Sequence, residues 1–351
     1  MTEVVSAVLF VGITAYAVFG GADFGAGFWD LTAGGAERGA RPRAVAAHAI
    51  GPVWEANHVW LIFVLVVLWT GFSEAFASIG LTLFVPLSLA ALGIVFRGSS
   101  FAFRKEVTRV SSERNFGAAF AISSVIVPYC LGAVAGAIAS GRVPAGGKAG
   151  DPWSSWVNPT SILGGVLAVV VCSYLAAVYL FFDARRTGDD EMATYFRVRA
   201  LAAAVVAGAV SIAGIFVLHE DARYVFDGLT SRALPLVVVS ALCGLGSLVL
   251  ILRGAQRGAR ALAIGAVAAI IWGWGVAQHP YVFPTTLKVS QAAAPDATLV
   301  TIVVVFLMAA VTILPAIGLL YVLDQKSLLD PDAAANALPE PNAGGDATVR
   351  G

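Results

Sequence analysis

Hydrophobic residues run along this chain in long stretches, and the short segments between them carry most of the charged residues. Nine stretches are long enough to cross the roughly 30 Å hydrocarbon core of a bilayer as helices, because a helix rises about 1.5 Å per residue. They cover roughly residues 4–31, 45–70, 76–102, 115–140, 159–182, 194–219, 233–253, 258–280 and 297–323. This pattern predicts an all-α integral membrane protein with nine transmembrane helices.

The composition supports a membrane protein. Of 351 residues, 58% are hydrophobic and 13% are charged, and the mean hydropathy is +0.83. Soluble domains carry about 25% charged residues. The formal net charge of zero gives no indication of a nucleic-acid partner, so we expect none. Cys130, Cys172 and Cys243 lie in apolar runs without metal-ligand spacing, which predicts neither a disulfide framework nor a metal site.

The distribution of Lys and Arg predicts the orientation of the chain. Loops one, three, five and seven carry fourteen of these residues, against five in loops two, four, six and eight. Because basic loops stay in the cytoplasm, we expect the N-terminus outside and the C-terminus inside. Residues 326–351 are rich in Asp, Ala, Pro and Gly, which predicts a disordered cytoplasmic tail.

Two short motifs recur at similar offsets. The third and seventh stretches end in an Arg-Gly pair, at Arg97 and at Arg253, and a Pro-Tyr pair occurs at 128–129 and again at 280–281. These offsets favour a pseudo-repeat of two four-helix bundles, residues 1–140 and 159–280, with 297–323 as one peripheral helix. The alternative is that two short matches arose by chance.

An acidic residue interrupts the second apolar stretch. Glu55 lies roughly 15 Å into the run that extends from about residue 44 to residue 72. A carboxylate near the bilayer centre costs on the order of 2.5–3.5 kcal/mol on insertion scales, which predicts a functional role. His58 follows at i+3 and therefore shares a helix face with Glu55.

The first stretch carries two further acids. Asp23 and Asp30 are seven residues apart and lie on one stripe of the predicted helix, while nearby glycines allow another helix to approach closely. If the first two helices pack together, Asp30, Asp23, Glu55 and His58 form a staircase from the cytoplasm to the membrane centre. One interpretation is a proton relay; the other is that the acids pair with cations and only hold the helices together.

Candidate partners for these acids lie in FRGSSFAFR, residues 96–104, where Arg97 and Arg104 are predicted to form structural ion pairs. Arg97 alternatively extends its head to the membrane surface. The four histidines lack a spacing that would clamp a haem, so an ordinary hydrogen-bonded histidine is the main interpretation. His58 and Trp54 remain the candidates for contact with a cofactor. No metal ligands are predicted.

Four segments, in this order along the chain, resemble subunit II of the cytochrome bd quinol oxidases. They are GADFGAG (21–27), GPVWEANHVWLI (51–62), FRGSSFAFR (96–104) and HPYVFPTTLKVSQAAAPDATL (279–299). The resemblance covers the chain to about residue 325, and several motifs in register are more specific than any one of them.

The resemblance implies a subunit of a bacterial plasma-membrane oxidase that reduces O₂ to water with electrons from a membrane quinol. It implies haem b and haem d on a partner, subunit I, while this chain supports that partner and lines a proton path. Asp23 and Glu55 match the acids of the family's motifs. Small single-helix subunits and a structural quinone or lipid are further candidate partners. The alternative is an ion-coupled secondary transporter that uses the same acids.

Overall fold

The computed structural model describes the backbone of residues 1–35, 37–104, 110–255 and 257–325. Within these ranges the side chains of residues 47–56, 101–104, 110–116, 314, 317 and 320–325 lie outside the described part. The predicted tail, 326–351, also lies outside it. The chain divides into two compact units, residues 1–303 and 304–351, and the packing described below is that of the first.

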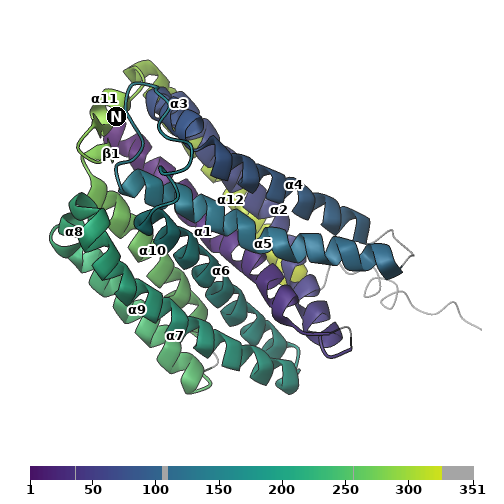
Figure 1. Ribbon diagram of the computed structural model, residues 1–351. Coiled ribbons are helices and arrows are strands. Elements are labelled where there is room, and N and C mark those ends of the chain that lie inside the picture. The colour runs from purple at the N-terminus through teal and green to yellow at the C-terminus, as the bar shows by residue number, and fades with distance from the viewer. Residues whose placement is uncertain (36, 105–109, 256, 326–351) are drawn as a thin grey trace, which may run out of the picture. The chain divides into compact units, whose positions relative to one another are not determined.

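Long helices form almost all of the described chain (Figure 1). The helices are α1 (Thr2–Thr32), α2 (Ala40–Gly71), α3 (Ser73–Thr82), α4 (Phe84–Arg104), α5 (Val110–Ala139), α6 (Pro159–Arg186), α7 (Asp190–Asp221), α8 (Arg223–Thr230), α9 (Leu234–Leu252), α10 (Ala259–Gln278), α11 (Val289–Ala292) and α12 (Asp296–Gln325). The strands β1 (Tyr281–Phe283) and β2 (Leu287–Lys288) form an antiparallel hairpin. The prediction of an all-α membrane protein is thus confirmed at the level of fold class.

Seven helices of the described chain are long and apolar enough to cross a membrane, or eight when a bent pair counts as one span. The bent pair joins residues 57–71 of α2 to α3 at an angle of 116°. The apolar part of α4, Phe84–Ser100, is shorter than the other candidates. The count of nine transmembrane helices therefore stays a prediction.

The third predicted span, 76–102, is divided between α3 and α4 at Leu83. Pro86 explains the division. Proline lacks an N–H group, and its ring collides with the carbonyl four residues earlier, here that of Thr82. The helix therefore stops at Thr82 and restarts at Phe84.

Two breaks in different parts of the chain share one backbone geometry. Phe72 separates α2 from α3 with φ −140° and ψ 56°, and Ala222 separates α7 from α8 with φ −136° and ψ 55°. In both places a long helix is followed by a short helix and then by another long helix. The predicted pseudo-repeat would place these two breaks at equivalent positions.

Helix α1 packs against α2, α5 and α6, and its glycines allow the close approach. A Cβ atom added at Gly25 would lie 1.9 Å from the backbone oxygen of Cys172 on α6, so only glycine fits there. One added at Gly12 would lie 2.7 Å from the ring of Phe63 on α2. Small residues thus replace the hydrophobic effect as the basis of helix packing inside a membrane.

The bundle has two different ends. The loop-rich end carries residues 140–158, 222–233 and 279–295, and the arginine-rich end carries the short connections around residues 33–39, 183–189 and 253–258. At the loop-rich end, backbone N–H groups of residues 146, 147 and 150 donate to the side chains of Glu74, Ser78 and Thr82. These acceptors recur every four residues on one face of α3, so the loop lies along that helix.

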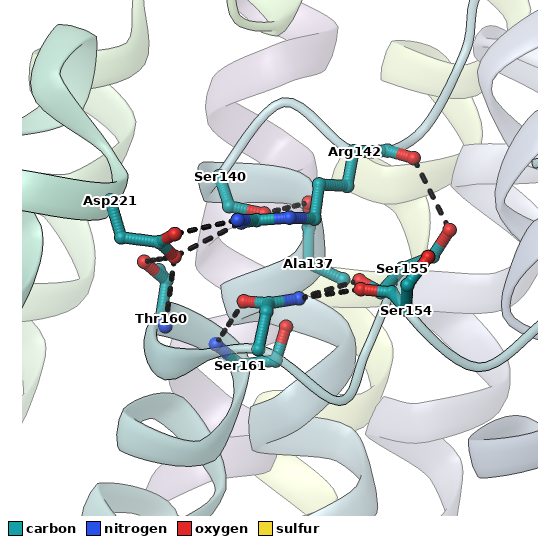
Figure 2. Close-up of polar contacts among 9 residues, drawn as sticks. Ala137, Ser140, Arg142, Ser154, Ser155, Thr160, Ser161 and Asp221 are labelled. Atoms are coloured by element: carbon teal, nitrogen blue, oxygen red, sulfur yellow. Dashed lines mark hydrogen bonds and ion pairs between the residues drawn. The ribbon is translucent and has the colours of Figure 1, made fainter. Parts of the chain in front are cut away.

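A second contact at the loop-rich end joins the loop after α5 to α6 and α7 (Figure 2). The guanidinium of Arg142 donates to both carboxylate oxygens of Asp221, at 3.0 and 2.6 Å. The backbone N–H and the hydroxyl of Thr160 donate to the same carboxylate, at 3.1 and 2.6 Å. Asp221 therefore holds the start of α6 beside the end of α7.

Candidate functional site

A fully buried ion pair joins α1 to α4. The side chains of Asp23 and Arg97 each expose 0% of their surface, and Nη2 of Arg97 lies 2.5 Å from Oδ1 of Asp23. The same Nη2 donates to the backbone oxygen of Asp23 at 2.9 Å. Arg97 lies seven residues before the end of α4, so its guanidinium is inside the bundle and does not extend to the membrane surface.

Helices α1 and α5 complete the surroundings of Arg97. Its Nη1 donates to the hydroxyl of Ser124, which in turn donates to the backbone oxygen of Phe120 at 2.6 Å. The guanidinium carbon lies 4.9 Å from the ring centroid of Phe24 and 4.1 Å from that of Phe120. Aromatic faces attract a desolvated cation, so the rings partly replace the water that Arg97 has lost.

Helix α2 contributes Asn57, which is 1% exposed. Its Nδ2 donates to Oδ2 of Asp23 at 3.3 Å, so each carboxylate oxygen of Asp23 accepts one side-chain bond. Asp23, Asn57, Arg97 and Ser124 are called the Asp23 cluster below.

Two glycines of α1 make room for the Asp23 cluster. A Cβ atom at Gly20 would lie 2.8 Å from Oδ1 of Asn57, and one at Gly27 would lie 2.1 Å from Oγ of Ser124. Gly20, Asp23 and Gly27 recur at three- and four-residue steps and share one face of α1. The glycine-rich segment around Asp23 therefore admits the polar side chains of α2 and α5.

Four buried polar atoms in and next to the cluster make no hydrogen bond within the described structure: Oδ1 of Asn57, Nε of Arg97, the hydroxyl of Tyr16 and Nε1 of Trp60. Gly12 meets Phe63 and Gly20 meets Asn57, so Tyr16, midway along this antiparallel contact, lies at the level of Trp60. The two nitrogens donate, the amide oxygen accepts and the hydroxyl does both. Water is the partner that satisfies such a set, since it donates and accepts.

Asp30 lies two turns from Asp23, at the arginine-rich end. It is 9% exposed, and Nε of Arg43 on α2 lies 2.9 Å from its Oδ1. Arg43 comes from the first turn of α2. Asp23 and Asp30 thus each have a guanidinium partner, but only that of Asp23 is fully buried.

The side chains of Glu55, Trp54 and Arg104 lie outside the described part of the structure, as does that of His48. His58 is half-buried in α2. In the predicted staircase Glu55 was expected beside Asp23. The α2 side chain that the structure places there is Asn57.

Sequence reasoning did not assign Asn57 or Ser124 to the site. Asn57 lies in the motif of residues 51–62. Its uncharged amide inside an apolar run could have marked it as a site residue. Nothing in the sequence marked Ser124 as a site residue. A serine in a transmembrane helix ordinarily donates to a backbone oxygen one turn earlier, and Ser124 also does so.

Two of the described histidines lie at the surface of the bundle and not in a haem pocket. Haem iron requires an axial ligand such as histidine. His219 and His279 are about half exposed, and a carboxylate, that of Glu220 or of Glu3, lies beside each. Among the described residues no group of three or more His, Cys, Asp or Glu could hold a metal ion.

These features define a class: a helical membrane protein that holds a charge-balanced polar cluster inside its bundle. Comparison with known sequences identifies the member of that class. The sequence model described as "Cytochrome bd terminal oxidase subunit II" matches residues 1–324. The chain belongs to this family. Its members are subunits of a haem-containing oxidoreductase complex of bacterial membranes.

Curated relatives carry the same designation. The chain is 28% identical over 241 residues to "Cytochrome bd ubiquinol oxidase subunit 2" of Bacillus subtilis (strain 168), over 68% of this chain and 67% of the relative. It is 25% identical over 228 residues to "Cytochrome bd-I ubiquinol oxidase subunit 2" of Escherichia coli (strain K12), over 62% of this chain and 58% of the relative.

A solved structure has the same fold. A chain of the bd oxidase from Geobacillus thermodenitrificans aligns with a TM-score of 0.74 at 22% identity, over 94% of this chain and 99% of that one. At 22% identity this similarity shows a shared fold only.

Proposed function

We propose that this subunit lines a path by which protons reach the oxygen-reducing centre of the oxidase. In this proposal the complex oxidises a membrane quinol and reduces O₂ to water, with haem b and haem d on subunit I. This chain lies in the bacterial plasma membrane with its N-terminus outside and its arginine-rich end in the cytoplasm. Its nine helices pack beside subunit I, and small subunits, a structural quinone or a lipid are further candidates for the assembly.

The observation that carries the proposal is the burial of the Asp23 cluster. Removing two charges from water costs several kcal/mol per ion, and a buried pair often adds no stability beyond that of apolar residues of the same volume. Packing alone therefore gives little reason for Asp23 and Arg97 to lie inside a membrane helix bundle. A need to move charge through the bundle would give such a reason.

The path begins at the arginine-rich end with Asp30 and continues along the same face of α1 to the Asp23 cluster. Beyond Asp23 the unpartnered atoms of Tyr16, Asn57 and Trp60 would hold water molecules. Such water extends the polar region around Asp23 by about two helical turns on the α1–α2 contact, beyond the level of Glu55.

Glu55 is the proposed exit to subunit I. It precedes Ile62 by seven residues and Trp69 by fourteen, so the helical period predicts that all three lie on one face of α2. Ile62 is 61% exposed and Trp69 is 62% exposed. This face of α2 is thus open to a partner, whereas Asn57 faces α1.

The replacement Glu55→Gln tests the proposal, because glutamine keeps the size of the side chain and cannot release a proton at neutral pH. We expect the assembled complex to retain its haem spectrum while quinol-driven O₂ consumption falls by tenfold or more. Glu74→Gln is the matched control, since Glu74 lies on α3 at the loop-rich end. Unchanged turnover in Glu55→Gln would leave this subunit a scaffold only.

The family assignment favours the oxidase over the transporter alternative. Co-purification separates the two directly. An oxidase subunit is expected to bring down a partner with a haem spectrum, and a transporter would purify alone and colourless.

A further inference from the structure

A pocket of ≈250 Å³ lies at the arginine-rich end, between α6, α7 and the backbone that follows α9. Its lining consists of Phe181, Arg185, Asp190, Ala193, Thr194, Arg197 and Gly254. It lies on α6, α7 and the backbone after α9, whereas the Asp23 cluster is formed by α1, α2, α4 and α5. The two sites thus have no residue in common.

The two arginines of the pocket are held by the C-terminal end of α9. Nη1 of Arg185 donates to the backbone oxygen of Gly254 at 2.7 Å. Nε and Nη2 of Arg197 donate to the backbone oxygens of Ile251 and Leu252, at 3.0 and 2.5 Å. These bonds fix the guanidinium planes, and they use only a minority of the five N–H donors that each group carries.

Neither arginine has a carboxylate partner in the described structure; their printed hydrogen bonds all go to backbone oxygens. At the same end of the bundle Arg43 pairs with Asp30, and Arg186 pairs with Asp183. Arg253 and Arg257, both exposed, lie beside the pocket in sequence and add positive charge. Asp190 is the one acidic residue of the lining and is itself exposed, so cations outnumber anions.

Half-buried guanidinium groups without a counter-charge favour an anionic ligand. Phosphate oxygens accept charge-assisted bonds from several guanidinium N–H donors at once. A phosphodiester would therefore replace the missing carboxylates, and the hydroxyl of exposed Thr194 offers a further donor.

Aliphatic side chains lead from the pocket into the membrane. Val198 and Val205 on α7 are 59% and 63% exposed, and Leu245 and Leu252 on α9 are 60% and 53% exposed. A ligand with acyl chains would cover these surfaces, and a free phosphate would not.

We infer that this pocket binds the headgroup of an anionic phospholipid from the adjacent leaflet. Basic pockets between transmembrane helices bind such headgroups, and the cytoplasmic leaflet is the one rich in anionic lipid. The inference does not depend on the proton path.

Native mass spectrometry of the delipidated, purified complex tests it, with phosphatidylglycerol as the probe and phosphatidylcholine and inorganic phosphate as comparison ligands. The double variant Arg185→Gln/Arg197→Gln should weaken the tightest phosphatidylglycerol site by about thirtyfold, as expected for two basic residues at a membrane surface. Arg186→Gln is the matched control, because Arg186 adjoins Arg185, is paired with Asp183 and does not line the pocket.

A second variant covers the case in which the double variant does not assemble. Thr194→Glu puts a negative charge at the mouth of the pocket and removes no contact that holds the helices, so it should weaken phosphatidylglycerol by about fivefold. Equal binding of phosphatidylcholine, displacement by millimolar inorganic phosphate, or an equal loss in Arg186→Gln would each overturn the inference.

Discussion

The two halves of the bundle, α1–α5 and α6–α10, bury different kinds of polar group. The first half buries the ion pair of Asp23 and Arg97. The second half buries a neutral chain: the hydroxyl of Tyr174 donates to Ser247 at 2.7 Å, and Ser247 donates to the backbone oxygen of Ala259 at 2.9 Å. Both halves are helical bundles of similar element order, so one architecture holds together with buried charges and without them.

The second half shows what packing alone requires. Besides the neutral chain, Arg260 of α10 donates to the backbone oxygen of Tyr179 on α6 at 2.8 Å, so the described contacts of α6, α9 and α10 include a cation but no buried ion pair. Arg253, the counterpart of Arg97 in the predicted pseudo-repeat, is exposed at the end of α9. The proposed proton path would account for this difference between the halves.

The largest effect is expected from Arg97→Met, which leaves the carboxylate of Asp23 buried without a cation. Breaking a buried pair in this way costs about 3–5 kcal/mol. We expect poor assembly, measured as the haem content and yield of the purified complex.

Arg253→Met is the matched replacement in the second half. Since Arg253 is exposed, the change should stay within about 0.5 kcal/mol. An equally severe loss in both variants would abolish the distinction between the two halves.

Gly25→Ala tests the contact of α1 with α6, where the halves meet. The new Cβ atom would lie 1.9 Å from a backbone oxygen, which cannot move without shifting the helix. Overpacking of this kind costs about 1–3 kcal/mol. The thermal midpoint of the complex should fall, whereas Gly208→Ala on α7, where nothing lies within 4 Å, should leave it unchanged.

Two tyrosine replacements, one in each half, are expected to change stability less than the glycine replacement does. Tyr174→Phe removes a hydrogen bond and should lower stability by about 1 kcal/mol with normal O₂ consumption. Tyr16→Phe removes no protein hydrogen bond in the described structure, so stability should hold while O₂ consumption falls, because a water partner is lost. Thermal melts and oxygen-electrode rates measure both, and the opposite pattern would remove Tyr16 from the path.

The smallest effect concerns pH at the arginine-rich end. The backbone N–H of Met192, which Asp189 caps, and then Arg41 hold the pKa of Asp189 below its usual range. A lowered folded pKa gives stability that is present above the unfolded pKa and lost as the pH falls through the folded one. The thermal midpoint should therefore drop from pH 6 toward pH 3 by more in the unaltered protein than in Asp189→Asn.

The sequence predicted the class of fold and the helices well, because apolar runs and loop charges are local signals. The break between α3 and α4 at Leu83 was missed, although Pro86 indicates that a helix is interrupted there. The β1–β2 hairpin was missed, although it lies inside the quoted segment 279–299. The ladder of Glu74, Ser78 and Thr82 was also missed, although their four-residue spacing marks one helix face.

The candidate site was predictable only in part. Helical spacing shows which residues of one helix share a face, and so it grouped Asp23 with Asp30. It does not show which helix meets that face, so Asn57 and Ser124 remained unassigned. For the same reason the sequence left open whether Arg97 forms an ion pair or extends to the membrane surface. Those contacts depend on where glycines let helices approach, which is a property of the packed bundle.

The central claim is that the Asp23 cluster exists to move protons and not to hold helices. The double variant Asp23→Asn/Arg97→Gln tests it most directly, because it removes both charges together and leaves no unpaired ion. In complex purified with its full haem spectrum, quinol-driven O₂ consumption should fall by tenfold or more. Full turnover in that complex would contradict the account.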